Sequence, residues 1–324
     1  MVTIADINHA GQQLAPHLAP TPLLESEALN QIAGGRVFIK PENLQQTGSF
    51  KIRGALNRLL HFTATEKAAG VVAYSSGNHA QGVACAAKML GIPATIVMPS
   101  DAPALKIDRT RGLGATVILY ERAAQNREEI ARSIAAEKDA VLVPPFDDHH
   151  VIAGQGTAGA EIAAALIDQN LTPDQFACPC SGGGLGGGSI IALRDKFPDL
   201  ASYIVEPQGF DDTARALASG TVTPNQPGAN SICDALLLPQ PGVMTLPILH
   251  QTKTQGLVVS DAQTRNAMRF AFRDLKLVVE PGGAVALAAV LSGQLQSAGK
   301  TTAIILSGGN VDPALFAAIL SSSD

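Results

Sequence analysis

Cysteine and long apolar runs are both scarce in this chain, and their scarcity excludes several classes of protein. Only 4 of the 324 residues are cysteine, too few for a disulfide framework, so the sequence predicts a reducing, cytoplasmic setting. No run of about 18 apolar residues occurs, which predicts that no segment spans a membrane. The N-terminus lacks a basic segment followed by an apolar core, so we expect no secretory signal.

A strong charge of one sign is also missing. The net charge is −5 and no basic block occurs, so nucleic acid is not expected as a partner. Hydrophobic residues make up 46% of the chain and charged residues 16%, which favours a large core over extensive disorder. A length of 324 residues corresponds to about two domains.

Short apolar runs rich in Val and Ile alternate with alanine-rich helical stretches. The predicted strands are residues 70–74, 94–98, 116–119, 176–180, 202–205 and 302–306. The predicted helices are residues 78–90, 128–137, 154–166 and 262–274. Apolar strands joined by helices are typical of parallel sheets with helices on both faces, so the sequence predicts an α/β fold.

Polar loops directly follow three of the predicted strands. Ser75, Ser181 and Ser307 each stand immediately after such a strand. Ligands gather at the carboxyl ends of parallel strands, so we expect the three loops to line one shared cleft.

One lysine between small polar residues carries the main chemical signal. Lys51 lies in residues 47–54, which read Thr-Gly-Ser-Phe-Lys-Ile-Arg-Gly. A lysine amine can form an imine with a carbonyl cofactor and so place an electron sink beside a substrate carbon. A lone lysine is more often a solvated surface residue. The polar segment 75–79 and the glycine-rich segment 181–188 favour the functional interpretation.

The glycine-rich segment 181–188, Ser-Gly-Gly-Gly-Leu-Gly-Gly-Gly, stands between a predicted strand and a helix. Glycines let backbone N–H groups converge on an anion, so we predict a phosphate site. The spacing Gly182-x-Gly184-x-x-Gly187 also satisfies the dinucleotide fingerprint, and Glu206 ends the next strand where a ribose-binding acid would lie. A nicotinamide-dependent oxidoreductase is therefore a second hypothesis, which leaves the lysine and the other polar loops without a role.

At these residues the chain resembles the fold-type II enzymes that use pyridoxal 5'-phosphate, and more narrowly the serine/threonine dehydratase and serine racemase family. The likeness covers residues 21–312. Five motifs stand in family order, at residues 47–51, 75–79, 153–157, 181–185 and 307–310. The resemblance implies two Rossmann-like parallel-sheet domains around a central cofactor cleft. Residues 70–147 would form the small substrate-gripping domain, and residues 1–69 with 148–324 the large cofactor-binding domain. Members are commonly dimers, which implies a homodimer.

The resemblance also implies how the cofactor is held. Lys51 would hold it as an imine, Phe50 would pack against its ring, and Asn78 would bond the ring hydroxyl. The backbone N–H groups of one loop would hold the phosphate, namely those of Ser181, Gly182, Gly183, Gly184 and Leu185. Ser307 would bond the pyridine nitrogen, and a hydroxyl there makes a milder electron sink, which suits β-elimination. The alternatives are a plain core residue for Phe50 and a helix N-cap for Ser307.

The segment 75–79 is implied to bind the substrate. Ser75 and Asn78 would hold the substrate carboxylate at the start of the next helix, where the helix dipole favours an anion. Ser76 would face Lys51 and act as a second acid/base, as in the racemases, or would only bind the carboxylate. His79 would touch the substrate or serve as a structural histidine.

Arg127 stands where the racemase branch places an arginine that reaches the substrate. Arginine grips carboxylates with a planar fork, so this residue favours 3-hydroxyaspartate over threonine. A solvated surface arginine is the alternative. Residues 231–238 are leucine-rich where the racemase branch has serines, which counts against racemisation.

The segment 206–212 resembles the divalent-ion site of the racemase branch. Glu206 and Asp212 would give carboxylates and Phe210 a backbone carbonyl. Such hard oxygen ligands suit Mg²⁺, Ca²⁺ or Mn²⁺. The alternative is an acidic loop that caps a helix over residues 211–218.

These inferences combine into one predicted function. The protein would be a pyridoxal-phosphate-dependent ammonia-lyase, a dehydratase that eliminates water from serine, threonine or 3-hydroxyaspartate to give a 2-oxo acid and ammonia. Lys51 would act as the general base at the substrate Cα. A serine racemase with side dehydratase activity is the nearest alternative.

Overall fold

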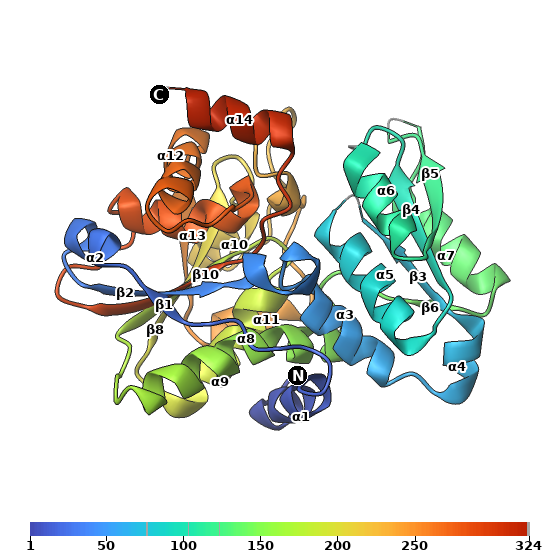
Figure 1. Ribbon diagram of the computed structural model, residues 1–324, viewed down its shortest axis with the longest axis horizontal. Helices are drawn as coiled ribbons and strands as arrows, with labels where there is room; N and C mark the ends of the chain where they lie inside the picture. Colours follow the sequence, from blue (N-terminus) through green and yellow to red (C-terminus); the bar gives the residue numbers. More distant parts are fainter. Residues whose placement is uncertain (76, 103, 123, 323–324) are drawn as a thin grey trace.

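The computed structural model describes residues 1–75, 77–102, 104–122 and 124–322. Its strands form two sheets that lie side by side, each covered by helices (Figure 1). Among the described residues, no helix has both the length and the apolar character needed to cross a membrane.

The larger sheet has six strands in the order β1-β2-β10-β7-β8-β9. Their bounds are β1 Leu24–Glu25, β2 Arg36–Pro41, β7 Gln175–Pro179, β8 Ala201–Pro207, β9 Gln255–Val259 and β10 Thr301–Leu306. Strand β1 runs antiparallel to its neighbour, whereas the other pairings are parallel. The central strands β10 and β7 are almost wholly buried, as their continuous apolar runs predicted.

The smaller sheet has four parallel strands in the order β5-β4-β3-β6. Their bounds are β3 Val71–Tyr74, β4 Ala94–Pro99, β5 Thr116–Tyr120 and β6 Val141–Leu142. All four fall within residues 70–147, the segment predicted to form the small domain. The domain limits themselves stay a prediction.

Helices connect the strands and cover both sheets (Figure 1). Those of the first half are α1 Ile4–Leu14, α2 Glu27–Ala33, α3 Lys51–Leu60, α4 Ala64–Ala69, α5 Asn78–Leu90, α6 Ala104–Gly112, α7 Arg127–Glu137 and α8 His149–Asp168. Those of the second half are α9 Gly184–Lys196, α10 Asp212–Ser219, α11 Thr245–Gln251, α12 Asp261–Arg273, α13 Pro281–Leu291 and α14 Pro313–Ser321. Short 3-10 turns are η1 Glu42–Leu44, η2 Gln46–Gly48 and η3 Asp234–Leu236.

Glycines allow α8 to pack closely against both α3 and α9. A Cβ atom on Gly154 would lie 2.5 Å from the carbonyl oxygen of Arg53 on α3, and one on Gly159 would lie 2.5 Å from the Cα of Ser189 on α9. Either contact is too short for a side chain, so these positions require glycine. Within the motif at residues 153–157, Gly156 also faces α9, since a Cβ there would lie 2.9 Å from the carbonyl oxygen of Gly188. The motif therefore has a packing role: it lets α8 hold α3 and α9 close together.

A buried network of charges fixes the start of α3. Arg53 is 1% exposed and donates to both carboxylate oxygens of Glu42, which is fully buried. It also donates to Glu161 on α8, to which Lys40 donates at 2.6 Å. Buried charges are tolerated when each has a partner, and this network ties β2, α3 and α8 together around the lysine.

Candidate active site

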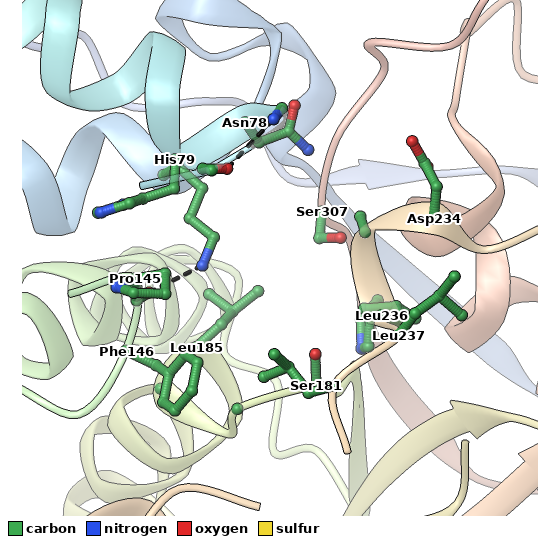
Figure 2. A pocket seen from close by; sticks show the side chains of 18 of the residues that line it. Asn78, His79, Pro145, Phe146, Ser181, Leu185, Asp234, Leu236, Leu237 and Ser307 are labelled. Atoms are coloured by element: carbon green, nitrogen blue, oxygen red, sulfur yellow. Dashed lines mark hydrogen bonds between the residues drawn. The ribbon is translucent and has the colours of Figure 1, made fainter. Parts of the chain in front are cut away.

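A cavity of about 490 Å³ lies where the carboxyl ends of the two sheets face each other. Ser75 after β3, Ser181 after β7 and Ser307 after β10 all line it. The three polar loops thus share one cleft, as their positions directly after predicted strands indicated. Figure 2 shows Asn78, Ser181 and Ser307 arranged around this space.

Lys51 is the first residue of α3, and its amine lies inside the cavity. The Nζ atom donates to the carbonyl oxygen of Pro145 at 2.8 Å and lies 4.9 Å from the centre of the Phe50 ring. Burial lowers the pKa of Lys51 to about 8, although the negative charge of Glu280 opposes the shift. A larger share of this amine is therefore neutral and nucleophilic near neutral pH than for a surface lysine.

The glycine-rich loop forms a cradle at the start of α9. Gly183 is the N-cap residue and adopts a left-handed backbone with φ of 81°. A Cβ on Gly182 would lie 2.2 Å from the Phe146 ring, and one on Gly184 would lie 2.4 Å from Oε1 of Gln155, so a side chain at either position would displace Phe146 or Gln155. The buried Oγ of Ser181 has no hydrogen-bond partner among the described residues. An unsatisfied hydroxyl beside N–H groups at a helix start fits a phosphate group.

Glu280 is a cavity residue that the sequence reasoning missed. It is 2% exposed, and its Oε1 accepts a hydrogen bond from Nδ2 of Asn78 at 2.5 Å. Burial, followed by the nearby charge of Asp234, raises the pKa of Glu280 to about 7. The sequence feature that could have identified it is a single acidic residue between an apolar run and Pro-Gly-Gly. In the structure this residue is the N-cap of α13.

Asn78 is held in place from two sides. Its Nδ2 donates to Glu280, and its Oδ1 accepts from Nδ2 of Asn310 at 2.8 Å. The same Asn310 nitrogen donates to the carbonyl oxygen of Thr47 at 2.8 Å. The amide nitrogen of Asn78 is thereby the atom turned toward Glu280. Ser307, which is 6% exposed, lines the same part of the cavity.

The predicted substrate residues also line the cavity, with one exception: Ser76 lies outside the described residues. Ser75 accepts a hydrogen bond at Oγ from the backbone N–H of Gly77 at 3.1 Å. Nε2 of His79 lies 2.9 Å from the carbonyl oxygen of Val143, so this nitrogen carries the proton. Burial, and then the charge of Lys51, lowers the pKa of His79 to about 3, which keeps the imidazole neutral.

Arg127 begins α7 at the edge of the cavity. Its guanidinium lies 5.5 Å from the centre of the Tyr74 ring, a cation–π distance. The position leaves the guanidinium free to receive an anion.

The segment predicted to bind a metal brings two carboxylates together away from the cavity. Glu206 accepts from the backbone N–H groups of Thr213 and Ala214, so it caps α10 as the alternative interpretation expected. Asp212 accepts from Asn225 at Oδ1, but its buried Oδ2 has no partner among the described residues. Burial and the charge of Asp212 raise the pKa of Glu206 to about 8. Two buried carboxylates this close together, one of them with an oxygen that has no hydrogen-bond donor among the described residues, fit a divalent ion.

No group of three or more His, Cys, Asp and Glu side chains that could hold a metal occurs in the described part of the chain. A cation at Glu206 and Asp212 would therefore need carbonyl or water ligands as well, as Mg²⁺ and Ca²⁺ accept. The predicted carbonyl of Phe210 belongs to the same loop, between β8 and α10.

Comparison with known proteins shows to which enzyme family the chain belongs. Residues 14–308 match the family model of pyridoxal-phosphate dependent enzymes, and the chain belongs to this family. It has the fold-type II architecture, as predicted. The family membership decides between the two cofactor hypotheses, in favour of pyridoxal phosphate over a dinucleotide.

Individual relatives are similar over nearly their whole length. The chain is 42% identical over 315 residues to the L-threo-3-hydroxyaspartate ammonia-lyase of a Pseudomonas species, covering 97% of each protein. The structure of maize serine racemase is 35% identical with a TM-score of 0.92, and covers 98% of this chain and 96% of its own. The structure of a threonine deaminase from T.th. is 41% identical with a TM-score of 0.90, covering 96% of this chain and 99% of its own.

Proposed function

We propose that this protein is an ammonia-lyase that eliminates water from a 3-hydroxy amino acid, with 3-hydroxyaspartate as the preferred substrate. Hydrolysis of the resulting enamine consumes one water and releases a 2-oxo acid and ammonia. One observation carries the proposal: a buried lysine amine of lowered pKa shares a cavity with a glycine cradle suited to phosphate. The 42% identity to an L-threo-3-hydroxyaspartate ammonia-lyase supports the substrate.

The chain's own residues would divide the work around the cofactor. The backbone N–H groups of Ser181 to Leu185 would bind its phosphate, Ser307 would face its ring nitrogen, and Phe50 would pack on its ring. Asn78 would donate from Nδ2 to the ring oxygen. When bound, pyridoxal phosphate supplies an electron sink that stabilises negative charge on the substrate Cα.

Lys51 would hold the cofactor before the reaction and then remove the proton from the substrate Cα. Its lowered pKa suits that role, because a general base works best when its pKa lies near the operating pH. The neutral imidazole of His79 cannot take part as an acid near pH 7 and would instead fix the loop at Val143. Ser75, Asn78 and the first N–H groups of α5 would hold the substrate carboxylate.

We further propose that Arg127 contacts the side chain of a dicarboxylic substrate. Glu206, Asp212 and the Phe210 carbonyl would bind Mg²⁺, or Ca²⁺ or Mn²⁺, as a structural ion. The molecule would be a homodimer in the reducing cytoplasm, with a small domain over residues 70–147.

Serine racemisation is the second candidate, and the 35% identity to maize serine racemase favours it. A racemase needs a second acid/base opposite Lys51, for which Ser76 is the proposed residue. Leu236, Leu237 and Leu238 line the cavity where more polar residues would help a serine substrate, which favours elimination over racemisation.

One assay separates these activities. The holoenzyme would be incubated with both enantiomers of serine, threonine and 3-hydroxyaspartate, with 2-oxo acid and substrate chirality followed together. We expect the highest kcat/KM for 2-oxo acid formation from one isomer of 3-hydroxyaspartate. Faster inversion of serine than elimination from any substrate would make the protein a racemase. A lack of both products would refute the proposed function.

A further inference from the structure

An ion pair crosses the cavity between the two sheets. Nζ of Lys106 on α6 donates to Oδ2 of Asp234 on η3 at 2.8 Å, and 128 residues separate the two. Both side chains line the cavity. Asp234 lies on the same wall as Leu236 and Leu237, as Figure 2 shows.

The two members of this pair differ in burial. The Lys106 side chain is 12% exposed, whereas that of Asp234 is 55% exposed. A largely buried ammonium is costly without an anion, but an exposed carboxylate can turn into water at little cost. Lys106 will therefore release Asp234 most readily when another anion takes its place.

The arginines of the cavity are placed differently. Arg122 pairs with Asp101 near the surface, where the side chains are 53% and 60% exposed. Water screens such a pair, so replacing Asp101 by a substrate carboxylate would add little binding free energy. Arg127 lies over the Tyr74 ring. Lys106 differs from both arginines because its ammonium is largely buried while its partner, the Asp234 carboxylate, is exposed enough to turn into water.

Lys106 also lies next to the proposed site of the substrate carboxylate. A Cβ on Gly77, the N-cap residue of α5, would lie 3.8 Å from Nζ of Lys106. The start of α5 and the Lys106 ammonium are therefore two neighbouring positions for negative charge. An amino acid with two carboxylates a few bonds apart can occupy both, while serine or threonine can occupy only one.

Resting on the ammonia-lyase function proposed above, we propose that Lys106 shares with Arg127 the binding of the side-chain carboxylate of a dicarboxylic substrate such as 3-hydroxyaspartate, and that the substrate carboxylate takes the place of Asp234 at Lys106. Asp234 holds Lys106 in its place until such a substrate arrives. Leu236, Leu237 and Leu238 supply no polar group on that wall, so a substrate without a second carboxylate leaves the ion pair closed.

Two substitutions test this exchange because they should act in opposite directions. Lys106→Met removes the cation and should raise KM for 3-hydroxyaspartate by about 10–100-fold, the loss of a charge-assisted hydrogen bond, with little change for serine. Asp234→Asn removes the competing anion and should lower KM for 3-hydroxyaspartate. A folding defect could raise KM in the Lys106→Met variant but would not lower KM in the Asp234→Asn variant, so the pair of results is specific to the exchange. Lys88→Met, at an exposed lysine in the last turn of α5, is the matched control and should leave both constants unchanged.

A binding measurement makes the result independent of turnover. Malate has the carbon skeleton of aspartate but no amino group, so it cannot react, and lactate is its monocarboxylic counterpart. By calorimetry on the holoenzyme, Lys106→Met should weaken malate binding by about tenfold or more and leave lactate binding unchanged. Unchanged malate binding, or equal losses for malate and lactate, would overturn the role of Lys106. A wild-type enzyme that deaminates no hydroxy amino acid yet binds malate through Lys106 would refute the proposed function alone.

Discussion

At the scale of single residues, burial sets the chemistry of the cavity. Lys51 and Glu280 face the same space, and burial lowers the pKa of the amine to about 8 while it raises that of the carboxyl to about 7. Both groups therefore change charge near neutral pH, which neither does in water. Nδ2 of Asn310 donates to Oδ1 of Asn78, which fixes the orientation of the Asn78 amide beside Glu280.

The lowered pKa of Lys51 predicts the pH dependence of cofactor loading. Only the neutral amine attacks a carbonyl, so the loading rate of the apoenzyme should rise with pH and level off above about 8. Absorbance of the bound cofactor measures the rate, and mass spectrometry after borohydride reduction should find the pyridoxyl group on Lys51. A rate that still rises near about pH 10, as for a surface lysine, would contradict the burial of the amine.

At the scale of elements, helix packing places the lysine and the phosphate cradle together. Helix α8 touches α3 on one side and α9 on the other, and glycines at the contacts let the backbones approach. The lysine starts α3 and the cradle starts α9, so the spacing of these helices sets the distance between the two.

Gly159→Ala tests the tightness of this packing. The new methyl group would lie 2.5 Å from Cα of Ser189, so the substitution should lower the free energy of unfolding by about 1–3 kcal/mol. Gly11→Ala is the control: it lies on α1 with no other atom within 4 Å of the new methyl group and should raise stability slightly. Denaturant unfolding of both variants measures the difference. Equal stability of the two would mean that α8 and α9 can separate without cost.

At the scale of the whole molecule, side chains from far apart in the chain join the two sheets across the cavity. Asn78 bonds Glu280 across 202 positions, and Lys106 pairs with Asp234 across 128. A substrate that displaces Asp234, as proposed, would therefore break a contact between α6 beside the smaller sheet and η3 beside the larger one.

Thermal stability is a property of the whole molecule, and the proposed cation site predicts its response to metal. A cation bound at Glu206 and Asp212 would neutralise two buried carboxylates, so chelation should lower Tm and added Mg²⁺ should restore it. Differential scanning calorimetry measures Tm, which for a chain of 324 residues shifts by about 1–2 °C for each kcal/mol of stability. Asp212→Asn should abolish the response to Mg²⁺. A wild-type Tm that neither chelator nor added metal changes would show that Glu206 and Asp212 bind no cation.

Local patterns predicted much of the fold. The strand predicted over residues 70–74 is β3 Val71–Tyr74, and the one over 302–306 is β10 Thr301–Leu306, because both are apolar runs bounded by polar residues. The predicted strand 176–180 lies one residue too late, since Pro179 ends β7. Strand β2 was missed because Lys40 and Pro41 interrupt its apolar run. Lys40 is buried because its ammonium donates to Glu161 and to the carbonyl oxygen of Thr21.

Sequence alone determined the parts that depend on neighbours along the chain: the strands with continuous apolar runs, several of the helices, and the loops with glycine and serine at the strand ends. It also determined the family, because those motifs stand in order. Only the tertiary structure decided which charges meet, since Glu280 and Asp234 lie far along the chain from Asn78 and Lys106. The lowered pKa of Lys51 was likewise decided by folding, because desolvation exists only once the surrounding chain has closed over the amine.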